Sequence, residues 1–394
     1  MVDVWWGLCE PAPGVYTFDK YVALAKLCRA KGLKVQATLS MHACGGNVGD
    51  SINIPLPPWV VAAADEHSFW FTDRARAVTK EYISFGADHA PVLPAGPRAA
   101  TGDTRTPVQA YEMFARAFVD AMREHALLGS VVTELQVGVG PCGELRYPGY
   151  PMDRWQFPGI GQFQCYDEYL LQDLRKCVQE TGSAEVKGAA MPPEGTGGYN
   201  DTPRRTEFFR RGYKGEAGRF FLRWYSERML RHGEDVLKAV RGVVEGEDLV
   251  LAVKVSGVHW WKHSASRAAE ATSGYMLGAG EPAYGEIARM LKRYDCVLDF
   301  TCLEMRTIDQ PWLRARCGPR QLVAEVFEAA RKEGVRVAGE NALERYDDVA
   351  YRQIVRAFRR CRAQRYGFTL LRLGDTLMEE DNLKRLGEFV KEMS

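Results

Sequence analysis

Short apolar runs alternate with longer segments of helical spacing along most of the chain. Seven runs predict strands, at 1–6, 33–41, 131–139, 249–258, 296–303, 335–339 and 368–373. This alternation is typical of βα units whose strands form a parallel sheet.

The segments between these runs carry signals for helices and loops. The helix expected over 16–31 ends at Gly32, a favourable C-cap. Pro107 suits the first turn of a helix from 106 to about 128. Further helices are expected over 166–179, 220–240, 284–292, 320–332, 348–362 and 382–393, and loops at 44–58, 94–105 (on the surface) and 182–200.

The count of about seven βα units indicates a (β/α)8 TIM barrel with long βα loops. Such a barrel needs eight units, so one strand is hidden in an insertion or the chain begins after the first unit. No linker divides the chain, and we expect one domain over residues 1–394.

Composition narrows the function classes. The 52 Lys and Arg nearly balance the 51 Asp and Glu, which leaves no basic footprint for nucleic acid. No apolar stretch is long enough for a membrane helix, and the start of the chain does not read as a targeting peptide. The 10 cysteines include no Cys-x-x-Cys pair, which argues against a disulfide framework or structural zinc and favours a reduced intracellular compartment.

Polar residues recur where the predicted strands end. In this barrel class the active site lies at the carboxyl ends of the strands. Each such residue alone could be an ordinary surface or capping group, but together they predict a cleft. They are Asp3, His42, Glu144, Lys254, His259, Thr301, Glu304, Glu340, Asn341 and Arg372.

Two glutamates stand out among these residues. Glu144 lies in the Gly- and Pro-rich segment 140–148, which fixes a stiff turn, and Glu340 ends a strand. Two carboxyl groups in one cleft are the equipment of glycoside hydrolysis, and an apolar, aromatic cleft can keep one protonated. Spacing alone leaves open a second interpretation, in which both are helix-start or ion-pair glutamates.

Tryptophans and a glycine-rich loop add to the candidate cleft. Trp5, Trp6, Trp260 and Trp261 lie near strand ends, where a flat ring suits the face of a sugar. Adjacent strand residues point to opposite faces, so one of each pair packs in the core; we include Trp260 as a candidate substrate contact. The loop 44–50 lacks the P-loop ending and predicts a mobile lid carrying Asp50. His42 has no second ligand at metal spacing, which favours a sugar contact or a structural histidine.

Nearly the whole chain, in order, resembles the plant and algal β-amylases of glycoside hydrolase family 14. The segments that carry the resemblance are 2–7, 42–50, 140–148, 157–161, 254–261, 300–305, 338–343 and 371–373. It implies an inverting exo-hydrolase that releases β-maltose from the non-reducing ends of α-1,4-glucans, in starch and maltooligosaccharides.

The resemblance also implies roles for single residues. Glu144 matches the general acid, and Glu340 the general base, with the carboxyl groups about 6.5–9.5 Å apart. Asp50 matches an essential carboxylate on the lid, and Thr301 lies on an inner loop that shifts with substrate. Glucan contacts are implied at Asp3, His42, Lys254, His259, Asn341, Ala342 and Arg372. No metal or organic cofactor is implied, and no nucleic-acid, membrane or specific protein partner.

The resemblance carries departures and alternatives. Family members have a further strand and helix before segment 2–6, so we expect an N-terminally incomplete barrel with two unpaired edges. The sequence of segment 140–148 most resembles that of plastid members, which favours a plastid over the cytoplasm as the location of the protein. One alternative is a catalytically inactive glucan-binding or regulatory relative. Another is a barrel enzyme of different chemistry, either a phosphate-using isomerase or aldolase or a retaining glycosidase, whose carboxyl groups would lie only about 5–5.5 Å apart. Modification of Cys44 or Cys142 could block the cleft, although inert packing is the favoured interpretation.

Overall fold

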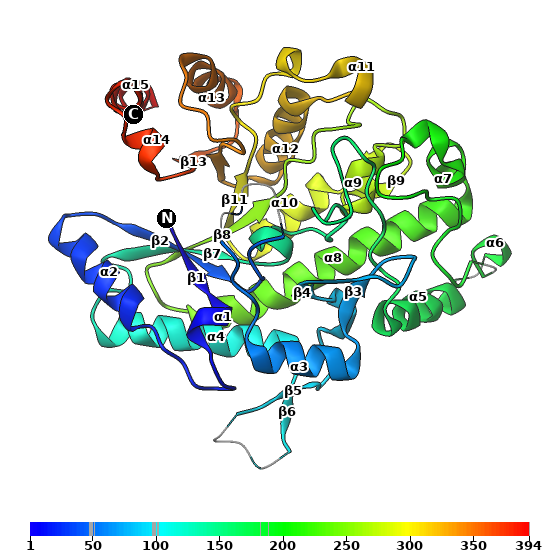
Figure 1. Cartoon of the computed structure of the whole chain (residues 1–394), viewed down its shortest axis with the longest axis horizontal. Helices are drawn as coiled ribbons and strands as arrows, with labels where there is room; N and C mark the ends of the chain where they lie inside the picture. Colours follow the sequence, from blue (N-terminus) through cyan, green and yellow to red (C-terminus); the bar gives the residue numbers. More distant parts are fainter. Residues whose placement is uncertain are drawn as a thin grey trace.

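A curled parallel sheet of seven strands forms the centre of the computed structural model, which describes residues 1–46, 50, 52–96, 100, 102–181, 183–187 and 189–393 (Figure 1). The strands, in order of hydrogen bonding, are β1 (Val2–Trp5), β2 (Val35–Ser40), β7 (Val132–Val137), β8 (Val250–Val255), β11 (Cys296–Phe300), β12 (Val337–Glu340) and β13 (Arg365–Thr369). All neighbours in this order are parallel.

All seven predicted sheet strands are present, and one was placed too late. β13 covers 365–369, whereas the apolar pattern predicted 368–373. The first residues of β13, Arg365 to Gly367, are exposed, so no apolar signal marks the start of this strand.

The ends of the strand order approach each other inside the sheet. The Thr369 hydroxyl of β13 lies 3.4 Å from the Gln36 side-chain oxygen of β2, although five places separate these strands in the order. Gln36 also donates to the Glu134 carboxylate of β7 at 2.7 Å. The sheet therefore curls around a polar interior, in agreement with the predicted (β/α)8 barrel.

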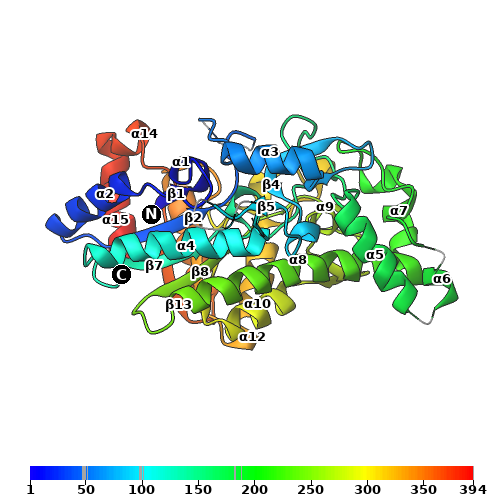
Figure 2. The ribbon, with the colours of Figure 1, turned by 90° about the horizontal axis from the view of Figure 1, so that it is seen from below.

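Long helices cover the outside of the sheet. They are α2 (Asp19–Ala30), α4 (Pro107–Glu124), α5 (Glu168–Glu180), α8 (Glu216–Val243), α10 (Tyr284–Arg293), α12 (Pro319–Glu333), α13 (Asp348–Arg360) and α15 (Glu380–Met393). α4 packs along α8 in both views (Figure 2). Thr106 starts α4 with a reciprocal capping box to Gln109, as the Thr-Pro signal predicted. Within the described residues, no helix is long and apolar enough to cross a membrane.

The long connections contain elements that the sequence pattern did not predict. They include the hairpins β3 (Trp70–Thr72) with β4 (Val78–Ile83), β5 (Leu93–Pro94) with β6 (Thr104–Arg105), and β9 (Met276–Gly278) with β10 (Glu281–Pro282). Short helices are α1 (Trp6–Cys9), α3 (Pro58–His67), α6 (Ala184–Lys187), α7 (Glu207–Arg210), α9 (Ala268–Thr272), α11 (Trp312–Ala315) and α14 (Asp375–Met378). Single 3₁₀ turns are η1 (Phe85–Ala87), η2 (Pro141–Gly143), η3 (Pro203–Arg205), η4 (Gly212–Lys214) and η5 (Thr307–Asp309).

The predicted surface loop 94–105 is wrong at its end. Arg105 is buried, its guanidinium lies 2.6 Å from the Glu10 carboxylate, and it stacks 4.8 Å over the Trp59 ring. The pairing of β5 with β6 directs Arg105 inward to the buried Glu10. Residues 97–99 and 101 of this segment lie outside the described part.

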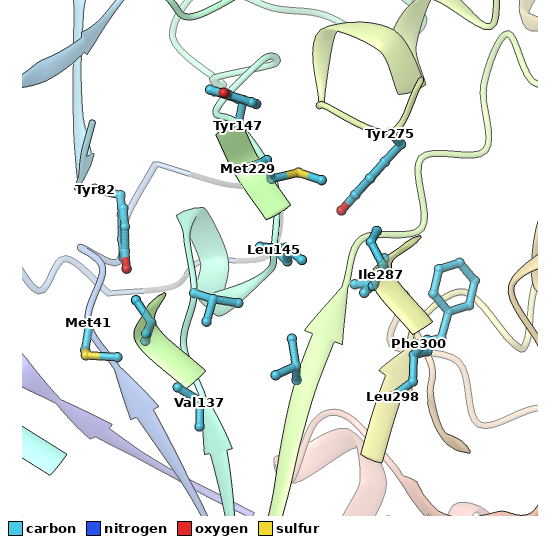
Figure 3. Packing of buried hydrophobic residues seen from close by; sticks show 14 of the residues in the cluster. Met41, Tyr82, Val137, Leu145, Tyr147, Met229, Tyr275, Ile287, Leu298 and Phe300 are labelled. Carbon is cyan, nitrogen blue, oxygen red and sulfur yellow. The ribbon is translucent and has the colours of Figure 1, made fainter. Parts of the chain in front are cut away.

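The apolar core lies between the strands, the covering helices and the insertions (Figure 3). It joins Val137 of β7 and Leu298 of β11 to Met229 of α8 and Ile287 of α10. Insertion residues such as Tyr82 of β4 extend the same cluster. The packed insertions therefore hold the loops at the carboxyl ends of the strands in fixed positions.

Candidate active site

Two glutamates and a lysine meet at the carboxyl ends of the strands. Glu340 is the last residue of β12, and Lys254 lies in β8. The Lys254 ammonium forms an ion pair with one Glu340 oxygen. Glu144 follows η2 and forms a β-bridge to Lys254, with Leu145 N–H donating to the Lys254 carbonyl at 2.9 Å. The structure therefore brings Glu144 and Glu340 to one place, beside Lys254.

Glu340 is almost completely enclosed. Its side chain is 1% exposed, and its Oε2 has no hydrogen-bond partner in the described part of the chain. Burial raises the pKa of Glu340, and Lys254 limits the rise. Burial also opposes the charged form of Lys254, but Glu340 and Glu144 outweigh it and raise the pKa of the ammonium. Lys254 is thus a fixed positive charge beside the carboxyl group.

The backbone around Glu144 is fixed by an unusual turn. Gly140 has φ 155°, and a Cβ there would lie 2.4 Å from the Glu144 carbonyl oxygen. Cys142 has φ 55°, and its N–H donates to the Glu81 carboxylate at 2.7 Å. This agrees with the stiff loop that the Gly- and Pro-rich sequence predicted.

The Glu144 side chain has a different partner from that of Glu340. Its Oε2 accepts a hydrogen bond from Arg146 Nε at 2.7 Å, and 10% of the side chain is exposed. The buried Arg146 guanidinium lies 4.5 Å from the Tyr150 ring. Glu144 is therefore held by a cation from its own loop, whereas Glu340 is held by a cation from β8, which β11 separates from β12 in the sheet.

His42 and Asp3 lie at the same end of the sheet. Burial, with the positive charges of Arg146 and Lys254, lowers the pKa of His42 to about 3, so its imidazole is neutral. The ring meets Trp5 edge-on at 5.2 Å between centroids. Asp3 accepts a hydrogen bond from the Ser40 hydroxyl at 3.1 Å, and burial raises its pKa.

The candidate residues after β8 form an aromatic wall. Burial disfavours the charged form of His259 and so lowers its pKa. The His259 Nδ1 lies 3.1 Å from the Gly257 carbonyl oxygen. Trp260 donates to the Gly159 carbonyl at 2.9 Å and meets Tyr150 at 5.1 Å between centroids. Because only 6% of Trp260 is exposed, little of its ring is free for a sugar.

Other candidates stabilise the segments that follow the strands. The buried Asn341 accepts from Leu371 N–H at 2.7 Å and donates to the Leu343 carbonyl at 2.8 Å, which joins the segments after β12 and β13. Ala342 N–H donates to the Glu304 carboxylate at 3.1 Å. The Asn341 amide is thereby occupied by the backbone.

Three candidates lie on the segments around this cluster. Thr301 is buried just after β11. Arg372 is exposed after β13, and its charge acts on Glu340 and Asp3. Asp50 is exposed, and its carboxylate accepts from Gly45 N–H at 2.8 Å. The rest of the predicted lid, residues 47–49 and 51, lies outside the described part.

Asp299 of β11 was not predicted as part of the site. It is fully buried, and within the described residues neither of its oxygens has a hydrogen-bond partner. Burial and the Glu340 carboxyl raise its pKa to about 8. In register, Asp299 stands opposite Lys254 of β8. No sequence pattern indicates this role, since Asp299 stands inside an apolar run; Arg146 and Glu81, also missed, become visible only through their contacts.

Comparison with known proteins places the chain among glycoside hydrolases. Residues 1–394 match the family model described as glycosyl hydrolase family 14. Two chloroplastic proteins of Oryza sativa subsp. japonica, β-amylase 2 and β-amylase 1, are 47% and 46% identical over 100% of this chain and 70% and 73% of their own lengths. The solved catalytic domain of a β-amylase from Paenibacillus polymyxa is 28% identical, with a TM-score of 0.80 over 98% of this chain and 89% of that one.

Proposed function

The chain belongs to glycosyl hydrolase family 14, and we propose that Glu144 and Glu340 are the general acid and general base of its hydrolytic reaction. The activity is that of a β-amylase: exo-hydrolysis of α-1,4-glucosidic bonds in starch and maltooligosaccharides, releasing β-maltose from non-reducing ends. The substrate class, an α-glucan, follows from the same membership.

The observation that carries the assignment is the buried ion pair between Lys254 and Glu340, bridged through the backbone to Glu144. A general base must be ionised before it can take a proton. The Lys254 ammonium stabilises the ionised form of Glu340 in surroundings that otherwise disfavour charge. This arrangement supports Glu340 as the base.

The proposed reaction is a single displacement at the anomeric carbon. Glu340 takes a proton from a water molecule while the water oxygen bonds to that carbon. The bond to the glycosidic oxygen breaks, and Glu144 donates its proton to this oxygen. The attack from the opposite face inverts the anomeric configuration, and it needs room for one water between the carboxyl groups.

Substrate contacts are proposed around this pair. Lys254 pairs with Glu340, and the charge of Lys254 also acts on His42 and Asp3. The remaining proposed contacts, on the surrounding loops, are Asp50, His259, Trp260, Thr301, Asn341, Ala342 and Arg372. We further propose that residues 1–394 act as one catalytic domain, and that the protein works in a plastid, which the chloroplastic relatives support.

The test follows the anomeric protons of maltose by NMR from the first minutes of hydrolysis of a short maltooligosaccharide. We expect β-maltose first, and a loss of rate of about 10²-fold or more in Glu144→Gln and in Glu340→Gln. Glu124→Gln, an exposed change at the end of α4, serves as the control.

The outcomes separate the alternatives. α-Maltose as the first product would overturn the inverting mechanism. Full rates in either glutamine variant of the proposed pair would remove that glutamate from its role. Glucan binding without any product, from folded protein, would favour the inactive glucan-binding alternative.

A further inference from the structure

A cavity lies on the outside of the barrel, between α12 and α13. Its volume is about 530 Å³, within the range of small-molecule sites. The two helices lie next to each other (Figure 1), and none of the proposed catalytic residues lines the cavity. We call this cavity the α12–α13 groove.

Cations line the α12–α13 groove. Four exposed arginines contribute to its lining: Arg320, Arg356, Arg360 and Arg362. Within the described part of the chain, no ion pair joins any of the four to a carboxylate, although the charge of Arg362 acts on Glu328. The one acidic lining residue, Glu328, already pairs with Arg331 at 2.7 Å. The groove therefore attracts anions.

Helix electrostatics explain only part of this arrangement. Arginines near the C-terminus of α13, such as Arg360, complement the negative end of that helix. Arg320 stands in the first turn of α12, where a cation faces the positive end of the helix dipole. Helix stability gives no reason for Arg320, whereas binding of an anion does.

An amide side chain also lines the groove. Gln353 of α13 is 6% exposed as a residue and lines the cavity, and no hydrogen bond joins its side chain to the described residues. Its amide atoms are not among the buried polar atoms that lack a partner, so the amide is open to the groove and can bind a ligand group that donates to it or accepts from it. A hydroxyl group can do both.

The apolar floor narrows the class of anion. It consists of Val323, Ala324, Phe327 and Ala357. The single aromatic lining residue, Phe327, is 4% exposed and offers no ring face for a nucleobase. An inorganic phosphate would leave most of the cavity unfilled. The lining thus suits an anion with a compact, non-aromatic, hydroxyl-bearing body.

We propose that the α12–α13 groove binds a phosphorylated sugar. The arginines hold the phosphate, because guanidinium groups form strong charge-assisted hydrogen bonds to phosphate oxygens. Gln353 binds a sugar hydroxyl, and the apolar floor contacts the C–H face of the ring. The site is separate from the glucan-hydrolysing cluster.

The test is calorimetric titration of the whole protein with glucose 6-phosphate and fructose 1,6-bisphosphate. We expect saturable binding of one sugar phosphate per chain, weakened about tenfold or more in Arg356→Gln/Arg360→Gln. The matched control, Arg352→Gln/Arg116→Gln, removes the same charge at exposed positions outside the groove and should bind as the unchanged protein does. Gln353→Leu should weaken the sugar phosphates but not inorganic phosphate.

Three results would overturn the proposal. One is the absence of saturable binding by both sugar phosphates. Another is equal affinity in the groove variant and the unchanged protein, which would put the ligand elsewhere. The third is inorganic phosphate binding as tightly as the sugar phosphates, which would reduce the groove to a general anion site. A circular dichroism spectrum matching the unchanged protein confirms that each variant is folded.

Discussion

Glu340 and Glu144 reach the same end of the barrel from two differently built regions. Glu340 ends a strand that is hydrogen-bonded on both sides, so the sheet itself fixes its backbone. Glu144 follows a turn in which Gly140 and Cys142 adopt positive φ. One carboxyl group is placed by long-range strand pairing, and the other by a short segment with special backbone geometry.

The cations beside the two carboxyl groups follow the same division. Lys254 reaches Glu340 from another strand, whereas Arg146 lies two residues from Glu144. The electrostatic setting of Glu340 therefore depends on assembly of the barrel. The setting of Glu144 depends mainly on its own loop, supported by Glu81.

The largest effect is expected from Lys254→Met, which removes the cation beside Glu340. Without the ammonium, the pKa of Glu340 should rise further, because burial is then no longer opposed by the positive charge. Because the proposed base must be ionised, the acidic limb of kcat/KM should move to higher pH, with part of the activity regained above the new pKa. The unpaired buried carboxyl should also lower the free energy of unfolding by roughly 3–5 kcal/mol.

pH–rate profiles and urea unfolding measure these two effects. The control is Lys262→Met, which removes another buried lysine from its ion pairs, with the buried Glu270 and with Glu325. It should lower stability without moving the acidic limb. An unchanged acidic limb in Lys254→Met would contradict the role given to the ion pair.

Two glycine variants compare the loop with the strand directly. A Cβ at Gly140 collides with backbone, so Gly140→Ala should displace Glu144 and reduce kcat by about a hundredfold. A Cβ at Gly339 would lie 2.3 Å from a Leu303 methyl and 2.8 Å from the Phe358 ring, which are side chains that can move. Gly339→Ala should therefore mainly lower the free energy of unfolding, by about 1–3 kcal/mol.

The readouts are kcat on a maltooligosaccharide and the urea midpoint of each variant. A fall in kcat for Gly140→Ala with little change in midpoint, and the reverse for Gly339→Ala, is the expected pattern. If both variants changed the same quantity, the distinction between loop and strand placement would fail.

Asp299→Asn tests how burial near Glu340, the proposed base, affects the ionisation of Asp299. The pKa of Asp299 is raised to about 8, whereas an unfolded aspartate titrates near about 3.9. Between these values the unfolded chain has lost a proton that the folded chain keeps, so Asp299 makes the fold less stable as the pH rises from about 4 to about 8. Asparagine does not titrate, and Asp299→Asn should gain on the order of 5 kcal/mol relative to the unchanged protein over this range.

Urea unfolding at pH 5 and pH 8 measures this difference. Asp295→Asn, at an exposed position four residues earlier, should show no comparable pH dependence. Parallel stability profiles for Asp299→Asn and the unchanged protein would show that Asp299 is ionised in the fold.

The smallest effect is expected from alkylation of Cys44 and Cys142, the two thiols near the segment that carries Glu144. Burial, with nearby carboxylates, raises the pKa of Cys44 to about 11, and burial also raises the pKa of Cys142 well above its usual value. At pH 7 the thiolate fraction should be roughly a hundredfold below that of an ordinary cysteine, so both should react slowly. Mass spectrometry measures the rate of alkylation while an assay follows activity, and urea-unfolded protein serves as the reactive reference. Fast modification with loss of activity would support a regulatory thiol.

Part of the fold and site could be predicted from local sequence. The apolar runs located all seven sheet strands, and Thr106 with Pro107 located the start of α4. Glu340 was selected as a candidate because it directly follows an apolar run, and Glu144 because glycine and proline surround it. The insertions were harder: β3 and β4 are stabilised by pairing and packing against distant segments, which short-range patterns do not encode.

Side-chain periodicity and backbone preference over a few residues are enough to specify the βα order, the polar residues at strand ends and the stiff turn before Glu144. Three features arise only when the barrel is assembled. Lys254 pairs with Glu340, Glu81 accepts a hydrogen bond from the turn before Glu144, and Asp299 is buried near the charges of Lys254 and Glu340. Desolvation and ion pairing depend on closing the sheet, because closure brings residues from separate strands into one low-dielectric interior.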